Sequence, residues 1–425
     1  DAAPPAPRLR RLTRPQYTNV LRDVFGAGLV IPTQLEPDLR DAGLQSVGAS
    51  STAISPRGVE QYEQAAFEVA RQLVDLPAFE STWLTCVPQS AGDAECAEEV
   101  LSAVGRRAWR RPLTDDELSR VVDLAAAIGA ADDDFYTGLE YGLAYLLQAP
   151  AFIYREEFGA QRDGRRELTD LELASRLSFL LWNTGPDEAL LSAAEAGELA
   201  TAEGLRAQAE RLLRDPRAQD GMASFFTELL ELDLLDDLSK DPLIFAQFSP
   251  ELGPVARTET LHVLNSIVFE EPADYRTFFT TRRAFPDRRL AAVYGIAAPS
   301  LDGAAEAWWP SDGMRRGFLG SASFLMLNAH SLTTSVTLRG KFVREVLLCQ
   351  TMPPPPGDVD TSIPEADENA RTMRERVAVH LEEPTCASCH NLMDPIGLGM
   401  ENFDAMGRWR VTENGVTIDT SGDLD

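Results

Sequence analysis

Cys386-Ala387-Ser388-Cys389-His390 decides how the C-terminal part of this chain is expected to fold. It is a C-x-x-C-H run, the pattern through which a c-type haem is attached to a polypeptide. Two thiols three positions apart are neighbours on one helical turn, where they can form thioethers with the two vinyl groups of one porphyrin. His390 then lies at the iron and can coordinate it through an imidazole nitrogen. The motif predicts covalent haem c, with Cys386 and Cys389 as attachment sites and His390 as proximal ligand.

Other interpretations of the motif are a chance pattern, half of a zinc site or a thioredoxin-like redox pair. A zinc ribbon needs a second Cys or His pair at matching spacing, and none lies nearby in the sequence. A thioredoxin-like pair should follow a βαβ pattern. Residues 370–381 upstream of the motif predict a helix instead, so we prefer haem.

The second axial ligand decides what such a haem does. A histidine or methionine saturates the iron and favours electron transfer, whereas an open position permits peroxide or oxygen chemistry. His380 lies six residues before Cys386, but a helix-terminal histidine or a propionate partner explains it equally well. Met393 follows His390 too closely to reach the opposite face easily. The choice stays open among six residues: His380, His330, His262, Met393, Met400 and Met406.

The haem propionates need cationic or hydrogen-bonding partners. Arginine suits them best because its planar fork pairs with both oxygens of a carboxylate, although each candidate is also explained by an ordinary ion pair. Calcium is a weaker expectation: three carboxylates near the motif offer oxygen ligands, but their spacing is not that of an EF-hand. The propionate candidates are Arg339, Lys341, Arg344, Arg408 and Arg410, and the carboxylates are Asp394, Glu401 and Asp404.

Length and charge narrow the class of protein. A chain of 425 residues is too long for one compact core and predicts two to four packed units. A hydrophobic content of 44% argues against disorder. The net charge of −28 argues against nucleic acid and anionic membranes as partners; it suits a basic redox partner or simply a solvated surface. No apolar run reaches about 18 residues, so we expect no transmembrane helix.

The chain has five cysteines, and three remain if the haem takes Cys386 and Cys389. Cys86 and Cys96 enclose a short polar loop and predict a disulfide, which persists outside the cytosol, where haem c is also attached. Cys349 lies on an apolar helical stretch and predicts a buried free thiol. The chain begins with Asp1 in a proline-rich, linker-like stretch without a signal sequence. We expect a periplasmic, cell-surface or secreted protein whose export signal has been removed, or a trimmed chain.

The sequence predicts a mainly α fold, with few short strands. Capping boxes of the form T-x-x-[E/Q] precede apolar-periodic runs at Thr13, Thr114 and Thr169. We find no strand–helix alternation. Helices are expected over residues 13–25, 57–75, 94–109, 114–128, 134–148, 171–182, 186–196, 201–214, 217–235, 253–270 and 370–381.

The C-terminal part of the sequence predicts a helix, a proline-rich spacer, several turns and a hairpin. Arg339-Gly340-Lys341 opens a helix to Cys349, and Pro353-Pro354-Pro355-Pro356 predicts a polyproline II spacer. After the motif, glycines predict turns and residues 409–420 predict a hairpin around Glu413-Asn414-Gly415. The glycines are Gly397, Gly399 and Gly407. We expect helical modules over residues 1–80, 81–148 and 149–310, followed by a haem module over residues 311–425.

The blocks that carry a family resemblance are spread over nearly the whole chain. They are Leu12–Tyr17 with Arg22-Asp23, residues 106–114, residues 148–155 with 173–182, Thr334-Ser335 with residues 338–341 and the tetraproline, and His380 with residues 386–390, 393–397, 401–404 and 407–408. In these blocks the chain resembles large exported proteins of planctomycetes and myxobacteria that carry consecutive domains of unknown function around a cytochrome c-type motif. Members usually extend by a further helical segment, which suggests that this chain is trimmed. The resemblance implies an exported haem protein and supplies no substrate.

Three functions are compatible with these features. The first is a mono-haem c-type cytochrome that passes electrons to a redox partner or to neighbouring copies, and a homo-oligomer is compatible with it. The second is a haem oxidoreductase, peroxidase- or oxygenase-like, with an open distal side. The third is a surface scaffold in which the haem is structural.

Overall fold

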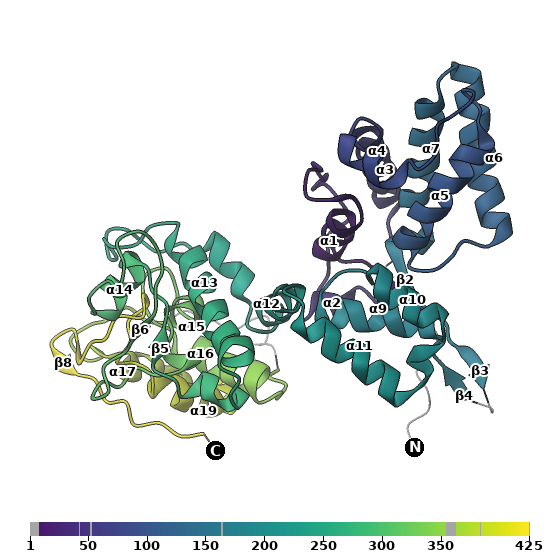
Figure 1. Cartoon of the computed structure of the whole chain (residues 1–425). Helices are drawn as coiled ribbons and strands as arrows, with labels where there is room; N and C mark the ends of the chain where they lie inside the picture. Colours follow the sequence, from purple (N-terminus) through teal and green to yellow (C-terminus); the bar gives the residue numbers. More distant parts are fainter. Residues whose placement is uncertain are drawn as a thin grey trace. The chain divides into compact units, whose positions relative to one another are not determined.

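The structure is a computed structural model that describes residues 8–41, 43–51, 53–162, 165–353, 363–382 and 384–424. Helices dominate it, which confirms the mainly α prediction, and the strands of the described residues form two-stranded sheets. The chain divides into two compact units, Asp1–Phe225 and Phe226–Asp425 (Figure 1). The boundary falls within α12 (Arg217–Leu229).

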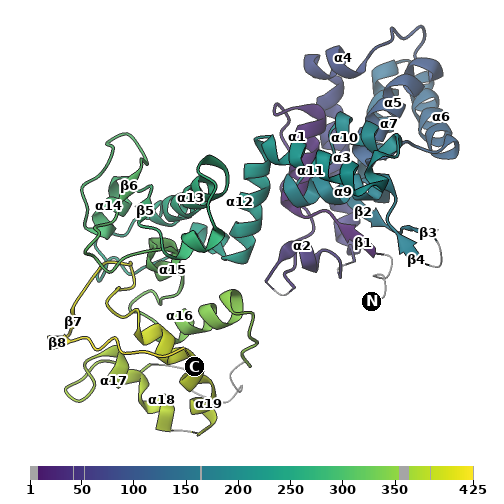
Figure 2. The same ribbon diagram turned by 60° about the horizontal axis from the view of Figure 1, so that its bottom comes forward.

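The first unit begins with a pairing that the sequence analysis did not anticipate. β1 (Arg8–Arg11) pairs antiparallel with β2 (Tyr154–Glu157), so two segments far apart in the chain lie side by side (Figure 2). The predicted capping boxes at Thr13, Thr114 and Thr169 are all present. The helices after them are α1 (Arg14–Phe25), α6 (Asp115–Asp132) and α9 (Asp170–Leu181).

A helical bundle supplies the core of this unit. α7 packs on α3, α5 and α6, and buries Leu139, Leu143 and Leu147. The apolar spacing of each helix explains this arrangement, since each buries one stripe. The bundle and its neighbours are α2 (Gln45–Gly48), α3 (Pro56–Val74), α4 (Pro77–Trp83), α5 (Ala94–Trp109), α7 (Phe135–Gln148), α8 (Pro150–Ile153), β3 (Ala160–Arg162), β4 (Arg165–Glu167), α10 (Glu188–Glu195), η1 (Glu198–Ala200) and α11 (Ala202–Arg214).

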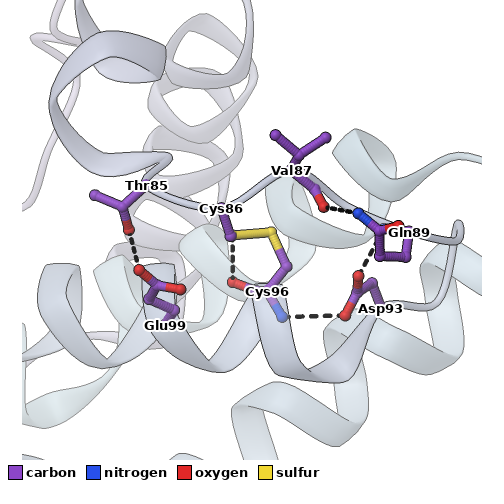
Figure 3. Close-up of a disulfide and its surroundings, with 7 residues drawn as sticks. All are labelled: Thr85, Cys86, Val87, Gln89, Asp93, Cys96 and Glu99. Carbon is purple, nitrogen blue, oxygen red and sulfur yellow. Dashed lines mark hydrogen bonds between the residues drawn. A yellow bond between two sulfur atoms is a disulfide. The ribbon is translucent and has the colours of Figure 1, made fainter.

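The predicted disulfide between Cys86 and Cys96 is present, with 5.6 Å between the two Cα atoms. Figure 3 shows the bond at the start of α5. The side chain of Asp93 caps this helix by accepting a hydrogen bond from the Cys96 amide at 3.1 Å. The disulfide and the cap together fix the first turn of α5 to the loop before it.

The second unit contains shorter elements. The predicted hairpin is present as β7 (Thr412–Glu413) and β8 (Val416–Thr417), and its loop residues Asn414 and Gly415 have positive φ, as a two-residue hairpin requires. The remaining elements are η2 (Leu232–Asp237), α13 (Leu252–Asn265), η3 (Ser266–Glu270), η4 (Tyr275–Phe279), β5 (Arg283–Ala284), α14 (Arg288–Tyr294), β6 (Ala307–Trp308), η5 (Phe318–Gly320), α15 (Ala322–Leu327), α16 (Val336–Phe342), η6 (Val343–Leu347), α17 (Met373–Val377), α18 (Val379–Glu382) and α19 (Pro384–Leu398).

Two predictions for this unit are wrong. Cys349 is exposed, because the helix has already ended in η6 and the residue takes a positive φ of 54° beyond it. Gly397 lies inside α19 and marks no turn, because the helix continues past the motif and uses this glycine for close packing. The predicted polyproline II spacer includes residues 354–356, which lie outside the described residues.

Candidate functional site

The motif lies on α19, which presents Cys386, Cys389 and His390 from consecutive turns of one helix. Residues three and four positions apart share a helix face, so both thiols and the imidazole are directed to the same side. Both cysteines are free thiols and partly exposed. A reactant can therefore reach the two sulfurs and the ring together.

A carboxylate one turn further along α19 holds the imidazole of His390. Its Nδ1 lies 2.8 Å from Oδ2 of Asp394, and the other carboxylate oxygen accepts a hydrogen bond from the Thr337 hydroxyl at 2.8 Å. Asp394 is only 1% exposed. A carboxylate accepts hydrogen bonds, so Nδ1 of His390 donates to Asp394, which leaves Nε2 as the nitrogen that can bind a metal.

His380 faces that Nε2 atom. Its Nδ1 lies 3.3 Å from Nε2 of His390, and the two rings are 4.7 Å apart between centroids at an angle of 79°. His380 belongs to the short helix α18, which packs on α19. Of the six axial candidates, His380 is thus the one that the structure brings to His390.

The other axial candidates have different surroundings. His330 is exposed, and burial of part of its ring, together with Lys240, lowers its pKa. The backbone carbonyl of His330 accepts a hydrogen bond from the Lys240 ammonium at 3.0 Å. Met400 is half-buried, while Met393 and Met406 are buried. His262 lies on α13 with its ring edge against Phe285.

Two glycines bring α16 and α19 into backbone contact. A Cβ atom added to Gly340 would lie 1.8 Å from the carbonyl oxygen of Met393, and one added to Gly397 would lie 1.9 Å from that of Val336. No larger residue fits at either position without moving a backbone. This crossing places Thr337 of α16 beside Asp394 of α19.

Arg339 holds the segment that follows the motif. Its guanidinium donates to the carbonyl oxygens of Met400, Phe403 and Asp404, each at 3.0 Å, and forms an ion pair with Glu401 at 3.2 Å. The side chain is fully buried, and burial lowers its pKa to about 10. We therefore assign Arg339 to the fold of this segment and not to a propionate.

Of the other propionate candidates, Arg408 and Lys341 are exposed, and Lys341 pairs with Glu345. The Arg410 guanidinium pairs with Glu401 at 2.8 Å. Arg344 is buried and donates to the carbonyl oxygen of Leu392 at 2.7 Å. Arg408 is therefore the arginine whose exposure leaves it accessible to a propionate.

The three carboxylates considered for calcium lie in separate environments. Asp394 contacts His390, Glu401 contacts Arg339, and Asp404 accepts from the amides of residues 406 and 408. Within the described ranges, no group of three or more His, Cys, Asp and Glu side chains is arranged to hold a metal ion.

Sequence reasoning missed the role of Asp394 and Thr337. The signal was present: Asp394 follows His390 by four positions, which places both on one face if the helix continues through the motif. The turn assigned to Gly397 hid this continuation. Thr337 gave no such signal, because its contact depends on the crossing of two helices.

Large apolar side chains are exposed beside the motif. Val379 and Leu381 flank His380 on α18, and Leu392 follows His390 on α19. In the described part of the chain, no helix is both long and apolar enough to span a bilayer.

Four stretches of the chain match models of protein families. Residues 10–75 match PSD3, a protein of unknown function (DUF1587), and residues 96–157 match PSD5 (DUF1595). Residues 168–296 match PSD4 (DUF1592), and residues 315–413 match PSCyt3 (DUF1588); both are also described as proteins of unknown function. The block of residues 148–155, which we grouped with the third module, falls in the second match.

Comparison with curated proteins and with solved structures gave no match. The four family matches follow one another along the chain, and the fourth covers both the block at Thr334-Ser335 and the block around residues 386–390. The chain thus carries four consecutive domains of unknown function, which supports its resemblance to the multidomain proteins built from them.

Proposed function

We propose that this protein is an exported mono-haem c-type cytochrome that transfers electrons. The observation that supports this most strongly is the donor set on α19: two accessible thiols and an imidazole whose Nδ1 is already tied to Asp394. Cys386 and Cys389 would form the thioethers, and Nε2 of His390 would be the proximal ligand. The haem supplies one-electron redox chemistry when bound, and the protein orients its ligand.

The residues around the motif fit a porphyrin. Val379 and Leu381 before the motif and Leu392 after it have exposed apolar side chains, as a surface that a porphyrin covers would. Arg408 is exposed on the segment after α19 and offers a cation for a propionate. The name of the family model that covers the motif, PSCyt3, agrees with a cytochrome-like domain.

His380 is our proposed sixth ligand. A metal between two imidazole nitrogens needs about 4 Å between them, since each metal–nitrogen bond is about 2.0–2.1 Å, as for zinc. The observed separation of His380 Nδ1 from His390 Nε2 is 3.3 Å, so the two rings have to move apart before both can bind one iron. Two histidines saturate the iron, and a saturated iron favours electron transfer over peroxide chemistry.

Other features support export and a basic redox partner. The disulfide between Cys86 and Cys96 indicates a compartment in which thiols stay oxidised, and haem c is attached in such a compartment. The net charge of −28 favours a basic redox partner, because opposite charges speed encounter between proteins.

An absorption spectrum of the oxidised protein, expressed with haem c maturation enzymes, tests the proposal. We expect a low-spin ferric spectrum that cyanide and imidazole leave unchanged over minutes, because both axial positions are filled. A high-spin spectrum with a rapid reaction toward peroxide would overturn electron transfer as the function. That result would favour the oxidoreductase with an open distal side.

A further inference from the structure

We propose that Asp394 is a positioning residue that orients the proximal histidine and lowers the midpoint potential of the haem iron. The inference rests on the proposed function, because it needs an iron bound to Nε2 of His390. It adds a determinant of the potential that the attachment motif itself does not contain.

Both oxygens of the Asp394 carboxylate have a defined partner. Oδ2 lies 2.8 Å from Nδ1 of His390, and Oδ1 accepts from the Thr337 hydroxyl at 2.8 Å. Only 1% of the surface of Asp394 is exposed, so water competes little with His390 and Thr337 for hydrogen bonds to its carboxylate. These two hydrogen bonds therefore fix the plane of the carboxylate, and the carboxylate in turn fixes the imidazole of His390.

The backbone fixes the position of this pair. Thr337 and Asp394 are the residues next to the two contact points at which α16 and α19 touch, Val336 against Gly397 and Met393 against Gly340. Both contacts are too close for any side chain at the glycine. The separation of Thr337 from Asp394 is thus set by two packed backbones, which move less than free side chains do.

A comparison with Glu401 shows what is particular about Asp394. Glu401 is equally buried, at 1%, but it pairs with the guanidinium groups of Arg339 and Arg410. Among the ion pairs of the described residues, Asp394 pairs with His390 alone. The negative charge of Asp394 therefore acts on the imidazole and is not neutralised by an arginine.

A carboxylate that accepts the Nδ1 proton makes the imidazole a stronger donor to its metal. A stronger donor favours ferric over ferrous iron, since the ferric ion carries the greater positive charge. The structure therefore assigns to Asp394 a lowering of the midpoint potential, and to Thr337 the task of holding Asp394 in place.

Three variants test this assignment: Asp394→Asn, Thr337→Val and Thr334→Val. Asp394→Asn keeps the shape and removes the charge, whereas Thr337→Val removes only the hydroxyl that holds the carboxylate. Thr334→Val is the matched control, because Thr334 also donates to a buried carboxylate, that of Glu401, at 2.9 Å but away from His390. Covalent haem content is measured first in every variant.

We expect the midpoint potential of Asp394→Asn to shift to more positive values, with covalent haem retained. Thr337→Val should shift it in the same direction by less, and Thr334→Val should leave it unchanged. In the His380→Ala background, which exposes a five-coordinate ferrous iron, resonance Raman should show a lower iron–histidine stretching frequency for Asp394→Asn. A merely structural role would not move this frequency.

Unchanged potentials and stretching frequencies in Asp394→Asn and Thr337→Val would overturn the inference, and so would an equal shift in Thr334→Val. If Asp394→Asn does not fold, Thr337→Val against Thr334→Val decides the question. Failure of the proposed function looks different, since the wild-type protein would then carry no covalent haem, or a high-spin iron that reacts rapidly with peroxide.

Discussion

The Nδ1 atom of His380 lies 3.3 Å from the Nε2 atom of His390, although the two residues belong to different helices. Nδ1 of His390 is the nitrogen that contacts Asp394, so the nitrogen of His390 that faces His380 is Nε2, the one that we assign to the iron. A metal inserted at this point would meet two imidazoles.

The first prediction concerns His380. His380→Ala should convert the ferric spectrum from low spin to high spin and allow cyanide to bind, because the sixth position opens. Covalent haem should remain, since both thiols are untouched. His330→Ala is the control and should keep the low-spin spectrum; an effect of His330→Ala equal to that of His380→Ala would contradict the assignment of the sixth ligand.

The second prediction concerns the crossing of α16 and α19. Gly340→Ala places a methyl group 1.8 Å from a backbone oxygen, so the helices must separate. We expect a loss of unfolding free energy of about 1–3 kcal/mol and a weaker hold on the haem. Gly185→Ala is the control, because its added Cβ meets only ordinary contacts at 3.7 Å or more. Denaturant titration of both variants checks the prediction, and equal midpoints would refute it.

The third prediction concerns the disulfide. Replacing Cys86 and Cys96 by Ala should cost the first unit about 2–4 kcal/mol, because the closed loop no longer restricts the unfolded chain. Hydrogen exchange of the α5 amides measures the loss where it occurs. Cys349→Ala should leave this exchange unchanged, because Cys349 is an exposed free thiol in the other unit. Slow exchange retained in the double variant would show that the disulfide contributes little to the stability of the first unit.

The fourth prediction concerns a buried carboxylate in the second unit. Glu259 is 2% exposed and accepts a short hydrogen bond from the Tyr294 hydroxyl, whose oxygen also accepts from the Ala322 amide. Burial raises the pKa of Glu259 to about 7, against the hydrogen bonds from Tyr294 and the Phe285 amide and the charge of Arg315. The folded protein therefore holds a proton here that the unfolded chain releases near its ordinary pKa of 4.5.

Stability from this group should fall as the pH rises. Below about 4.5 both states are protonated, and between about 4.5 and 7 the unfolded state loses its proton first, so the unfolding free energy declines across this window by up to about 3 kcal/mol. Glu259→Gln cannot titrate and should flatten the dependence. Calorimetric unfolding from about pH 5 to pH 8 measures it. Glu365→Gln, at an exposed site, should retain the wild-type slope; a wild-type slope in Glu259→Gln would contradict the assignment.

Local chemistry explains what the sequence predicted well. The capping boxes at Thr13, Thr114 and Thr169 involve residues three apart, so their partners are visible in the sequence. The same device at Thr372 was overlooked, although its Glu375 partner is equally close. The disulfide and the C-terminal hairpin also depend on neighbours in the chain.

Contacts between distant segments explain the misses. β1 pairs with β2 across more than a hundred residues, and no local pattern in four-residue strands indicates such a partner. Arg339 was considered for a propionate because its charge was visible and its four oxygen partners were not. The motif predicted the thiols and the imidazole on α19. The hydrogen bond between Asp394 and His390 could be recognised only once the helix was known to continue past the motif.

The central claim is that a porphyrin is covalently bound through Cys386 and Cys389. The protein, matured with haem c attachment enzymes, should be denatured, extracted with acidified organic solvent and weighed by mass spectrometry. We predict that the colour stays with the chain, that its mass exceeds the polypeptide by one haem, and that replacing both cysteines by Ala removes both signals. A colourless wild-type chain with the mass of the unmodified polypeptide would contradict the account.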